Sequence, residues 1–145
     1  MRRNFIWVML FLIFNGMLIS FPGISYGDII VIGNRSVPEA ELSSREIKKI
    51  YLGKKNLWSN GYKIIFVMLK KGDITKRFLK NYLKKNPDIF DKYWKKKIFH
   101  GSKSLPTVFE REKDLVEYVA KTRGAIGYIS SESYSDYVKI LSVLH

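Results

Sequence analysis

Short apolar runs bounded by turn residues set the limits on how this chain can fold. They are residues 28–33 (DIIVIG), 62–69 (YKIIFVML), 125–130 (AIGYIS) and 138–144 (VKILSVL). Runs of this length with many β-branched residues are typical of buried strands. The segments between them carry apolar residues at helical spacing, so the sequence predicts an α/β fold. We expect a three-layer αβα sandwich with a mixed, mainly parallel sheet, in which the last strand can pair antiparallel.

Capping signals predict where the helices of this fold begin. Ser43 is followed three residues later by Glu46, the pattern of a capping box. Asn86 precedes Pro87, a combination typical of a cap and the first helical residue. Asp73 is expected to cap the helix that follows the second apolar run. The predicted helices therefore start near residues 44, 74 and 87, and a further helical face covers residues 115–120.

The amino terminus has the pattern of an export signal. Two arginines precede a largely apolar stretch at residues 5–21, which a Pro-Gly pair ends. A positive start followed by an apolar stretch is typical of a secretory signal peptide. Small residues precede Asp28, so cleavage before Asp28 is the favoured interpretation. The alternative is an uncleaved membrane anchor, because about 20 apolar residues suffice to span a bilayer. We expect a signal peptide at 1–27, an α/β domain at 28–145 and a periplasmic location.

Size and charge limit the possible functions of residues 28–145. These 118 residues are enough for one domain and too few for two. The absence of Cys excludes disulfides and lipid attachment through a cysteine. Without the two arginines of the signal, 24 Lys and Arg stand against 13 Asp and Glu, which gives a net charge of about +11. Such a charge favours anionic partners.

Catalysis and metal binding have little support in the sequence. His100 and His145 are far apart, and neither has an acidic or Cys neighbour at metal-ligand spacing. The chain contains no G-x-S-x-G nucleophile motif. We therefore expect a protein that is not an enzyme and that has no metal or other cofactor. The lysines and aromatics of residues 92–97 are interpreted as a solvated face and a core face, and nucleic-acid binding is not expected.

A series of short motifs gives the sequence a more specific resemblance. In chain order they are L-S-x-x-E at 42–46, I-Y-L-G-K at 50–54, W-x-x-G at 58–61, Y-W at 93–94 and G-A-I-G-Y at 124–128. In order and spacing the series resembles small phosphate ABC transporter substrate-binding family proteins. It also resembles one lobe of the larger phosphate binders of the periplasmic binding protein class. The resemblance covers Val31 to about Ser130 and implies a single-lobe, periplasmic binding protein-like fold of class II.

The resemblance also implies where a ligand binds. In the larger phosphate binders a strand ends in R-S-D-G-S-G-T-T-F, whose Arg, hydroxyls and backbone amides hold the anion. Aligned on Phe78, the corresponding residues here are KKGDITKRF at 70–78. Lys70 occupies the Arg position and keeps the charge, although it cannot form the two-pronged contact that Arg makes with phosphate. Asp73 stands where the family has Gly, and its carboxylate repels an anion unless it caps the helix. The implied contacts are Lys70, Lys71, Gly72, Asp73 and Thr75.

A second group of candidate residues follows the first predicted strand. Ligands of open α/β sheets lie beyond the carboxyl ends of the parallel strands. The turn after residues 28–33 contains Asn34, Arg35 and Ser36, and we expect these side chains to contribute to the same site. The alternative for each candidate residue is a solvated loop position in a lysine-rich protein.

Two functions from different classes remain open at the level of the sequence. The first is a periplasmic solute-binding protein for a small oxyanion, phosphate first, linked to ABC-type transport or sensing. Its partners are expected to be an ABC transporter permease, a sensor protein or a second copy of the chain, because a lone lobe covers only half of such a site. The second is a non-catalytic periplasmic interaction module that kept the fold and lost the ligand. Contact with the membrane is expected only through an uncleaved signal segment.

Overall fold

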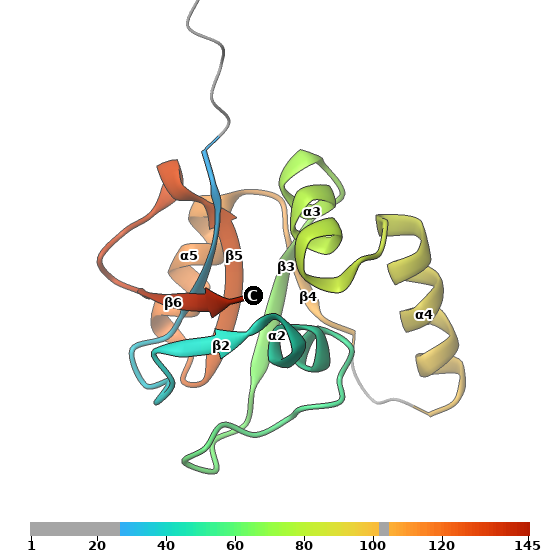
Figure 1. Ribbon diagram of the computed structural model, residues 1–145, viewed down its shortest axis with the longest axis horizontal. Helices are drawn as coiled ribbons and strands as arrows, with labels where there is room; N and C mark the ends of the chain where they lie inside the picture. Colours follow the sequence, from blue (N-terminus) through green and yellow to red (C-terminus); the bar gives the residue numbers. More distant parts are fainter. Residues whose placement is uncertain (1–26, 102–104) are drawn as a thin grey trace, which may run out of the picture.

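A single six-stranded sheet forms the centre of the domain (Figure 1). The computed structural model describes residues 27–101 and 105–145, so the predicted signal peptide lies outside the described residues except for Gly27. The strand order is β2-β6-β1-β5-β3-β4. The strands are β1 (Ile29–Gly33), β2 (Glu41–Ser43), β3 (Ile65–Leu69), β4 (Thr107–Phe109), β5 (Ala125–Ser130) and β6 (Lys139–Leu144).

The strand directions confirm a mixed sheet. β2 pairs parallel with β6, and β3 pairs parallel with both β4 and β5. β1 pairs antiparallel with β5 and β6. Three of the five pairings are therefore parallel, and the last strand has one neighbour of each kind. The carboxyl end of β1 therefore lies at one end of the strands, and the carboxyl ends of β3 and β5 lie at the other end.

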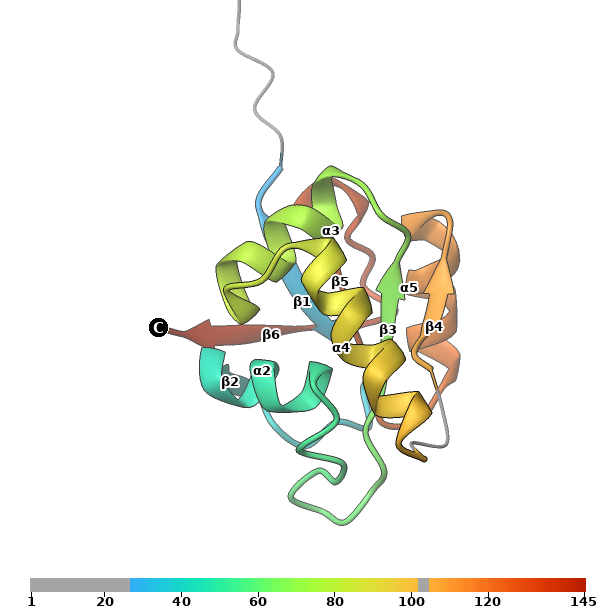
Figure 2. The ribbon, with the colours of Figure 1, turned by 90° about the vertical axis from the view of Figure 1, so that its right-hand side faces the viewer.

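Helices cover both faces of the sheet, as expected for three layers. The helical elements are α2 (Ser44–Tyr51), α3 (Asp73–Phe78), the π-helix η1 (Leu79–Leu83), α4 (Pro87–Phe99), α5 (Glu112–Lys121) and the 3-10 turn η2 (Ser131–Ser133). Successive side chains of a strand point to opposite faces. The ring of Tyr128 in β5 packs against α2 and α3, whereas a Cβ at Gly127 would lie against Leu115 of α5. Figures 1 and 2 show that α5 covers one face of the sheet and that α2, α3 and α4 lie on the other face.

The predicted helix starts at Ser43 and Asn86 are confirmed. Ser43 and Glu46 form both halves of the capping box, with the Glu46 amide donating to the Ser43 hydroxyl at 3.2 Å. The Asn86 side chain accepts from the amide of Ile89 at 2.8 Å, and Pro87 is the first helical residue. These signals were readable because every group in them lies within one turn of the helix end.

The predicted cap at Asp73 is wrong. The N-cap residue of α3 is Gly72, and no side chain accepts a hydrogen bond from the first turn. Asp73 is instead the first helical residue, and its carboxylate lies 3.7 Å from the guanidinium of Arg77. After Phe78 the helix continues as the π-helix η1 and ends at Lys84, whose φ is 55°.

The strands at the two edges of the sheet were not predicted. β2 and β4 have three residues each, and each pairs with one strand only. The second apolar run was also predicted too long, because β3 begins at Ile65 and not at Tyr62. Within the described residues no helix is long and apolar enough to cross a membrane.

Aromatic rings hold α2 and α3 against the sheet. Tyr128 of β5 stacks on Phe78 of α3 with ring centroids 3.9 Å apart and an interplanar angle of 7°. Tyr51 of α2 meets the edge of Phe78 at 4.8 Å. All three side chains are fully buried. The aromatic cluster therefore packs α2 and α3 against the same strand, β5.

Candidate functional site: a pocket at the start of two helices

The turn between β3 and α3 is held in place by a buried hydroxyl network. The Thr75 hydroxyl lies 2.8 Å from the carbonyl oxygen of Lys70 and 2.9 Å from the Tyr128 hydroxyl. The Tyr128 hydroxyl in turn accepts from the amide of Leu69 at 3.3 Å. Because each hydroxyl carries a single proton, Thr75 donates to the carbonyl and accepts from Tyr128. Thr75 thus shapes the turn with its hydroxyl, and that hydroxyl already has protein partners.

Two helix starts meet at this turn. α3 begins after Gly72 and α5 begins after Arg111, and in the part of the chain that the structure describes neither has a side-chain cap. They border a hollow of about 430 Å³, which we call the α3 pocket, lined by residues 69–75 and 110–112. The first amides of a helix point away from it with a positive dipole end, an arrangement that favours anions. The α3 pocket therefore combines two such ends with the side chains of two lysines and one arginine.

Carboxylates lie close to the same cations. The ion pairs are Lys70 with Glu110 at 2.6 Å, Lys71 with Asp91 at 2.7 Å and Asp88 at 3.2 Å, and Arg111 with Asp114 at 2.8 Å. Hydrogen bonds to Asp91 and then Asp88 raise the pKa of the Lys71 ammonium. The Lys70 and Glu110 side chains are 57% and 76% exposed, so solvent weakens their attraction. An incoming anion would compete with these carboxylates for the cations.

Among the described residues Glu112 forms no ion pair at the pocket. Its carboxylate accepts from the amide of Ser130 at 2.5 Å and from the hydroxyl of Ser133 at 3.0 Å. It thereby ties the start of α5 to the end of β5. This role was missed by sequence reasoning, as was the position of Glu110 and Arg111 in the pocket. The only local signal was the run Glu110-Arg111-Glu112 before a helical pattern, which does not indicate the strand that it faces.

The structure places Asn34, Arg35 and Ser36 away from the α3 pocket. β1 runs antiparallel to β5, and β5 runs parallel to β3. The turn after β1 therefore lies at the opposite end of the strands from the turn after β3. The expectation that both groups meet at one edge is therefore wrong, because it assumed a parallel first strand. Of the eight predicted contacts, residues 70–73 and Thr75 line the α3 pocket.

Asn34 and its neighbours have local partners that account for their positions. The Asn34 side-chain amide donates to the carbonyls of Val119 and Ala120 at 2.8 and 2.9 Å. These carbonyls belong to the last turn of α5, so Asn34 satisfies acceptors that the helix leaves open. Ser36 accepts from the amide of Gly124 at 3.0 Å, and Arg35 donates to the carbonyl of Asp136. Arg35 also borders a separate hollow of about 960 Å³ beside α5.

The buried tyrosine of the hydroxyl network makes the fold sensitive to alkaline pH. Burial raises the pKa of Tyr128 to about 12, and the hydrogen bonds with Thr75 and Leu69 oppose that rise. Tyrosine in an unfolded chain ionises near pH 10. The unfolded state therefore loses its proton first, so stability is fully present below about pH 10 and is lost as the pH rises toward 12.

We expect the urea midpoint to fall between pH 9.5 and roughly 11. Tyr128→Phe should make this fall shallower, because it removes one of the buried tyrosines, with Tyr51, whose pKa is raised in the folded state. Tyr137→Phe is the control, since Tyr137 is 73% exposed. Equal pH dependence in Tyr128→Phe and the unaltered chain would contradict the assignment.

Comparison with known families places this chain in a family. The family model described as PBP superfamily domain matches residues 23–139. The chain therefore belongs to that family, in agreement with the periplasmic binding protein resemblance of its motifs. Among the described residues no group of three or more His, Asp or Glu is arranged to hold a metal ion. A comparison with curated proteins gives no match.

Solved structures of phosphate-binding proteins share the fold. A protein from Clostridium perfringens, assigned as a phosphate ABC transporter substrate-binding protein and solved with bound phosphate, aligns with a TM-score of 0.60 and 23% identity over 81% of this chain and 45% of that one. PstS from Borrelia burgdorferi aligns with a TM-score of 0.60 and 21% identity, over 81% and 47%. An ABC-type phosphate transport receptor from Vibrio cholerae gives 0.57 and 16%, over 81% and 46%. The chain thus spans less than half of each of these proteins.

Proposed function

We propose that this protein is an exported, periplasmic solute-binding protein that binds phosphate or a similar oxyanion for ABC-type transport or sensing. The observation that carries the proposal is the convergence of two uncapped helix starts and three cationic side chains on the α3 pocket. The turn that builds this pocket is the segment that aligns with the phosphate-holding segment of the larger binders. Membership in the PBP superfamily domain family and the shared fold of the phosphate-binding structures support the same function.

The pocket predicts weak binding by a single copy of the chain. The α3 pocket opens to solvent, because the side chains of Lys70, Lys71 and Arg111 are 57%, 59% and 73% exposed. A second copy of the chain or a transporter subunit would have to cover the anion. A binding function of this kind requires no catalytic group.

A second function is favoured by the carboxylates around the pocket. Lys70, Lys71 and Arg111 each have an acidic partner, and Asp73 stands at the first position of α3. These groups reduce the attraction for a small anion. A non-catalytic interaction module would keep the fold without a ligand and would use its many other lysines to contact an acidic protein.

Calorimetry on the full chain at low salt separates the two functions. We expect saturable heat with phosphate, weakened roughly ten-fold or more by Lys70→Ala, because a hydrogen bond to a charged group is lost. Lys63→Ala is the matched control, since Lys63 is also exposed but precedes β3, at the other end of the strand. Absence of heat with phosphate and sulfate, or equal weakening by both variants, would reject the α3 pocket as the anion site.

A further inference from the structure

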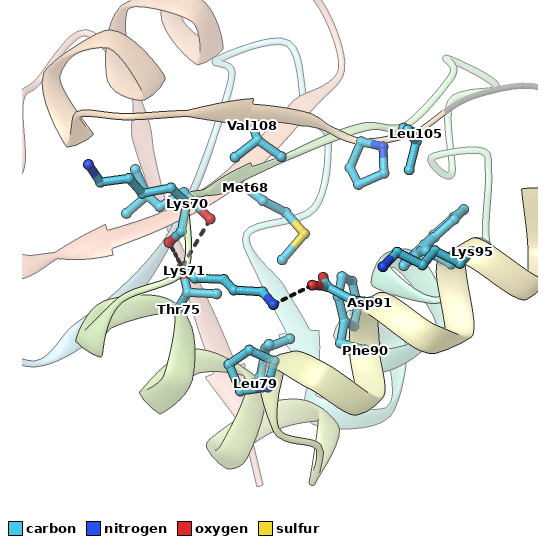
Figure 3. A pocket seen from close by; sticks show the side chains of 14 residues that line it. Met68, Lys70, Lys71, Thr75, Leu79, Phe90, Asp91, Lys95, Leu105 and Val108 are labelled. Carbon is cyan, nitrogen blue, oxygen red and sulfur yellow. Dashed lines mark hydrogen bonds and ion pairs between the residues drawn. The ribbon is translucent and has the colours of Figure 1, made fainter.

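A second hollow lies on the other side of the turn that borders the α3 pocket. We call it the α4 pocket; it has a volume of about 400 Å³ and lies between α4 and the edge of the sheet formed by β3 and β4 (Figure 3). Pockets that take small molecules have volumes of about 300–1,000 Å³. The α4 pocket is therefore large enough for a small ligand or for one substituent of a larger ligand.

The floor of the α4 pocket is apolar. Met68, Phe90 and Trp94 reach it from β3 and α4, and each is at most 5% exposed. The indole N–H of Trp94 donates to the carbonyl of Tyr51 at 3.1 Å, so the ring offers only its carbon atoms to the pocket. Val108 of β4 forms a wall and is 57% exposed. A polar ligand would find few hydrogen-bond partners on this floor, whereas an alkyl or aryl group would bury apolar surface.

Charged side chains lie at the rim of the same pocket. Figure 3 shows Lys71 extending toward Asp91 of α4, and Lys95 lying beside that carboxylate. The α3 and α4 pockets share the residues of the turn, namely Leu69, Lys70, Lys71 and Thr75. The two lysines therefore border both a hollow lined mainly by charged residues and a hollow with an apolar floor.

From this juxtaposition we infer that the ligand is an amphipathic anion, such as a phosphonate or phosphate monoester with a short alkyl or single aryl group. Its anionic group binds at the Lys70–Gly72 turn, and its apolar group lies on Met68, Phe90 and Trp94. The inference rests on the proposed function, because it uses the same anion position, and it adds the class of substituent. Inorganic phosphate would leave the apolar floor unused and would bind less tightly.

The test compares anions that differ only in their apolar group. Full chain is titrated by calorimetry at low salt with inorganic phosphate, methylphosphonate and phenylphosphonate. We expect phenylphosphonate to bind about ten-fold more tightly than methylphosphonate, from the apolar area that the ring buries. Val108→Gln should weaken phenylphosphonate binding about three-fold and leave phosphate binding unchanged. Ile140→Gln is the matched control, because Ile140 is an exposed strand residue in β6, which three strands separate from β4.

The outcomes distinguish this inference from the proposed function. Equal affinities for methylphosphonate and phenylphosphonate, with phosphate still bound, would overturn the inference and leave the proposed function standing. Equal effects of Val108→Gln and Ile140→Gln on phenylphosphonate would also overturn it. Failure of all three anions to bind would overturn both. Val108 and Ile140 are both surface residues, so thermal unfolding of the two variants should match that of the unaltered chain.

Discussion

Gly124→Ala is expected to destabilise the domain by roughly 3 kcal/mol or more, as measured by urea unfolding. Gly124 has a φ of +75°, which costs a residue with a side chain about 1–2 kcal/mol. A Cβ there would also overlap the backbone carbonyl oxygen of Lys63, and relief of such overpacking costs typically about 1–3 kcal/mol. The carbonyl of Gly124 accepts from Trp58 at 2.9 Å and from Ile65 at 3.1 Å, so the backbone cannot shift without loss of these bonds.

Gly61→Ala is the matched control for this prediction. Gly61 has a φ of +84°, and a Cβ there would have no atom within 4 Å. It therefore carries the backbone cost alone, about 1–2 kcal/mol. The difference between the two variants measures the cost of the close approach of Gly124 to the Lys63 carbonyl. Equal losses of stability would show that this approach does not constrain the residue.

Local signals in the sequence predicted much of the fold correctly. The capping box at Ser43 and the cap at Asn86 depend on atoms within a few residues of each other. The core strands were readable because their apolar runs are continuous. β2 and β4 gave no such signal, since three residues at a sheet edge depend on pairing with a distant partner. Local signals are therefore sufficient for elements that are stabilised locally.

Strand direction was the information that the sequence lacked. A buried strand reads the same in either direction, so the apolar run of β1 could not reveal its antiparallel pairing with β5. Because of this antiparallel pairing, Asn34, Arg35 and Ser36 lie at the opposite end of the strands from the predicted site. The site residues on a single turn, 70–75, stayed together because the chain itself holds them together.

The role of individual polar groups in the site also depended on distant residues. Thr75 was predicted to contact a ligand, yet its hydroxyl is engaged by Lys70 and Tyr128. Arg111 was not predicted, although it starts the helix that faces the turn. A residue type indicates which bonds a side chain can make, and the packing of β3, β5 and α5 decides which bonds it does make.

Phe78→Ala is the second large effect that we expect, a loss of about 3–5 kcal/mol in the free energy of unfolding. The Phe78 ring is fully buried and contacts Tyr51, Tyr82 and Tyr128 with centroid distances of 3.9–5.2 Å. Truncation to Ala leaves a cavity among three rings that are themselves held by other contacts. Thermal and urea unfolding of the full chain measure the loss. Phe99→Ala is the control, because Phe99 is 88% exposed and surface changes usually stay within about 0.5 kcal/mol.

Phe78→Leu separates the loss of volume from the loss of the aromatic contacts. Leucine fills much of the cavity, and aromatic pairs contribute about 0.5–1.5 kcal/mol beyond the area that they bury, so we expect a folded protein with a smaller loss than Phe78→Ala. Phe78 of α3 stacks on Tyr128 of β5, and the Tyr128 hydroxyl accepts a hydrogen bond from Leu69, the residue before Lys70. If the aromatic cluster positions the α3 pocket, Phe78→Leu should weaken phosphate binding although position 78 lies outside the pocket. Unchanged affinity in a destabilised variant would show that the hydroxyl network alone positions the turn.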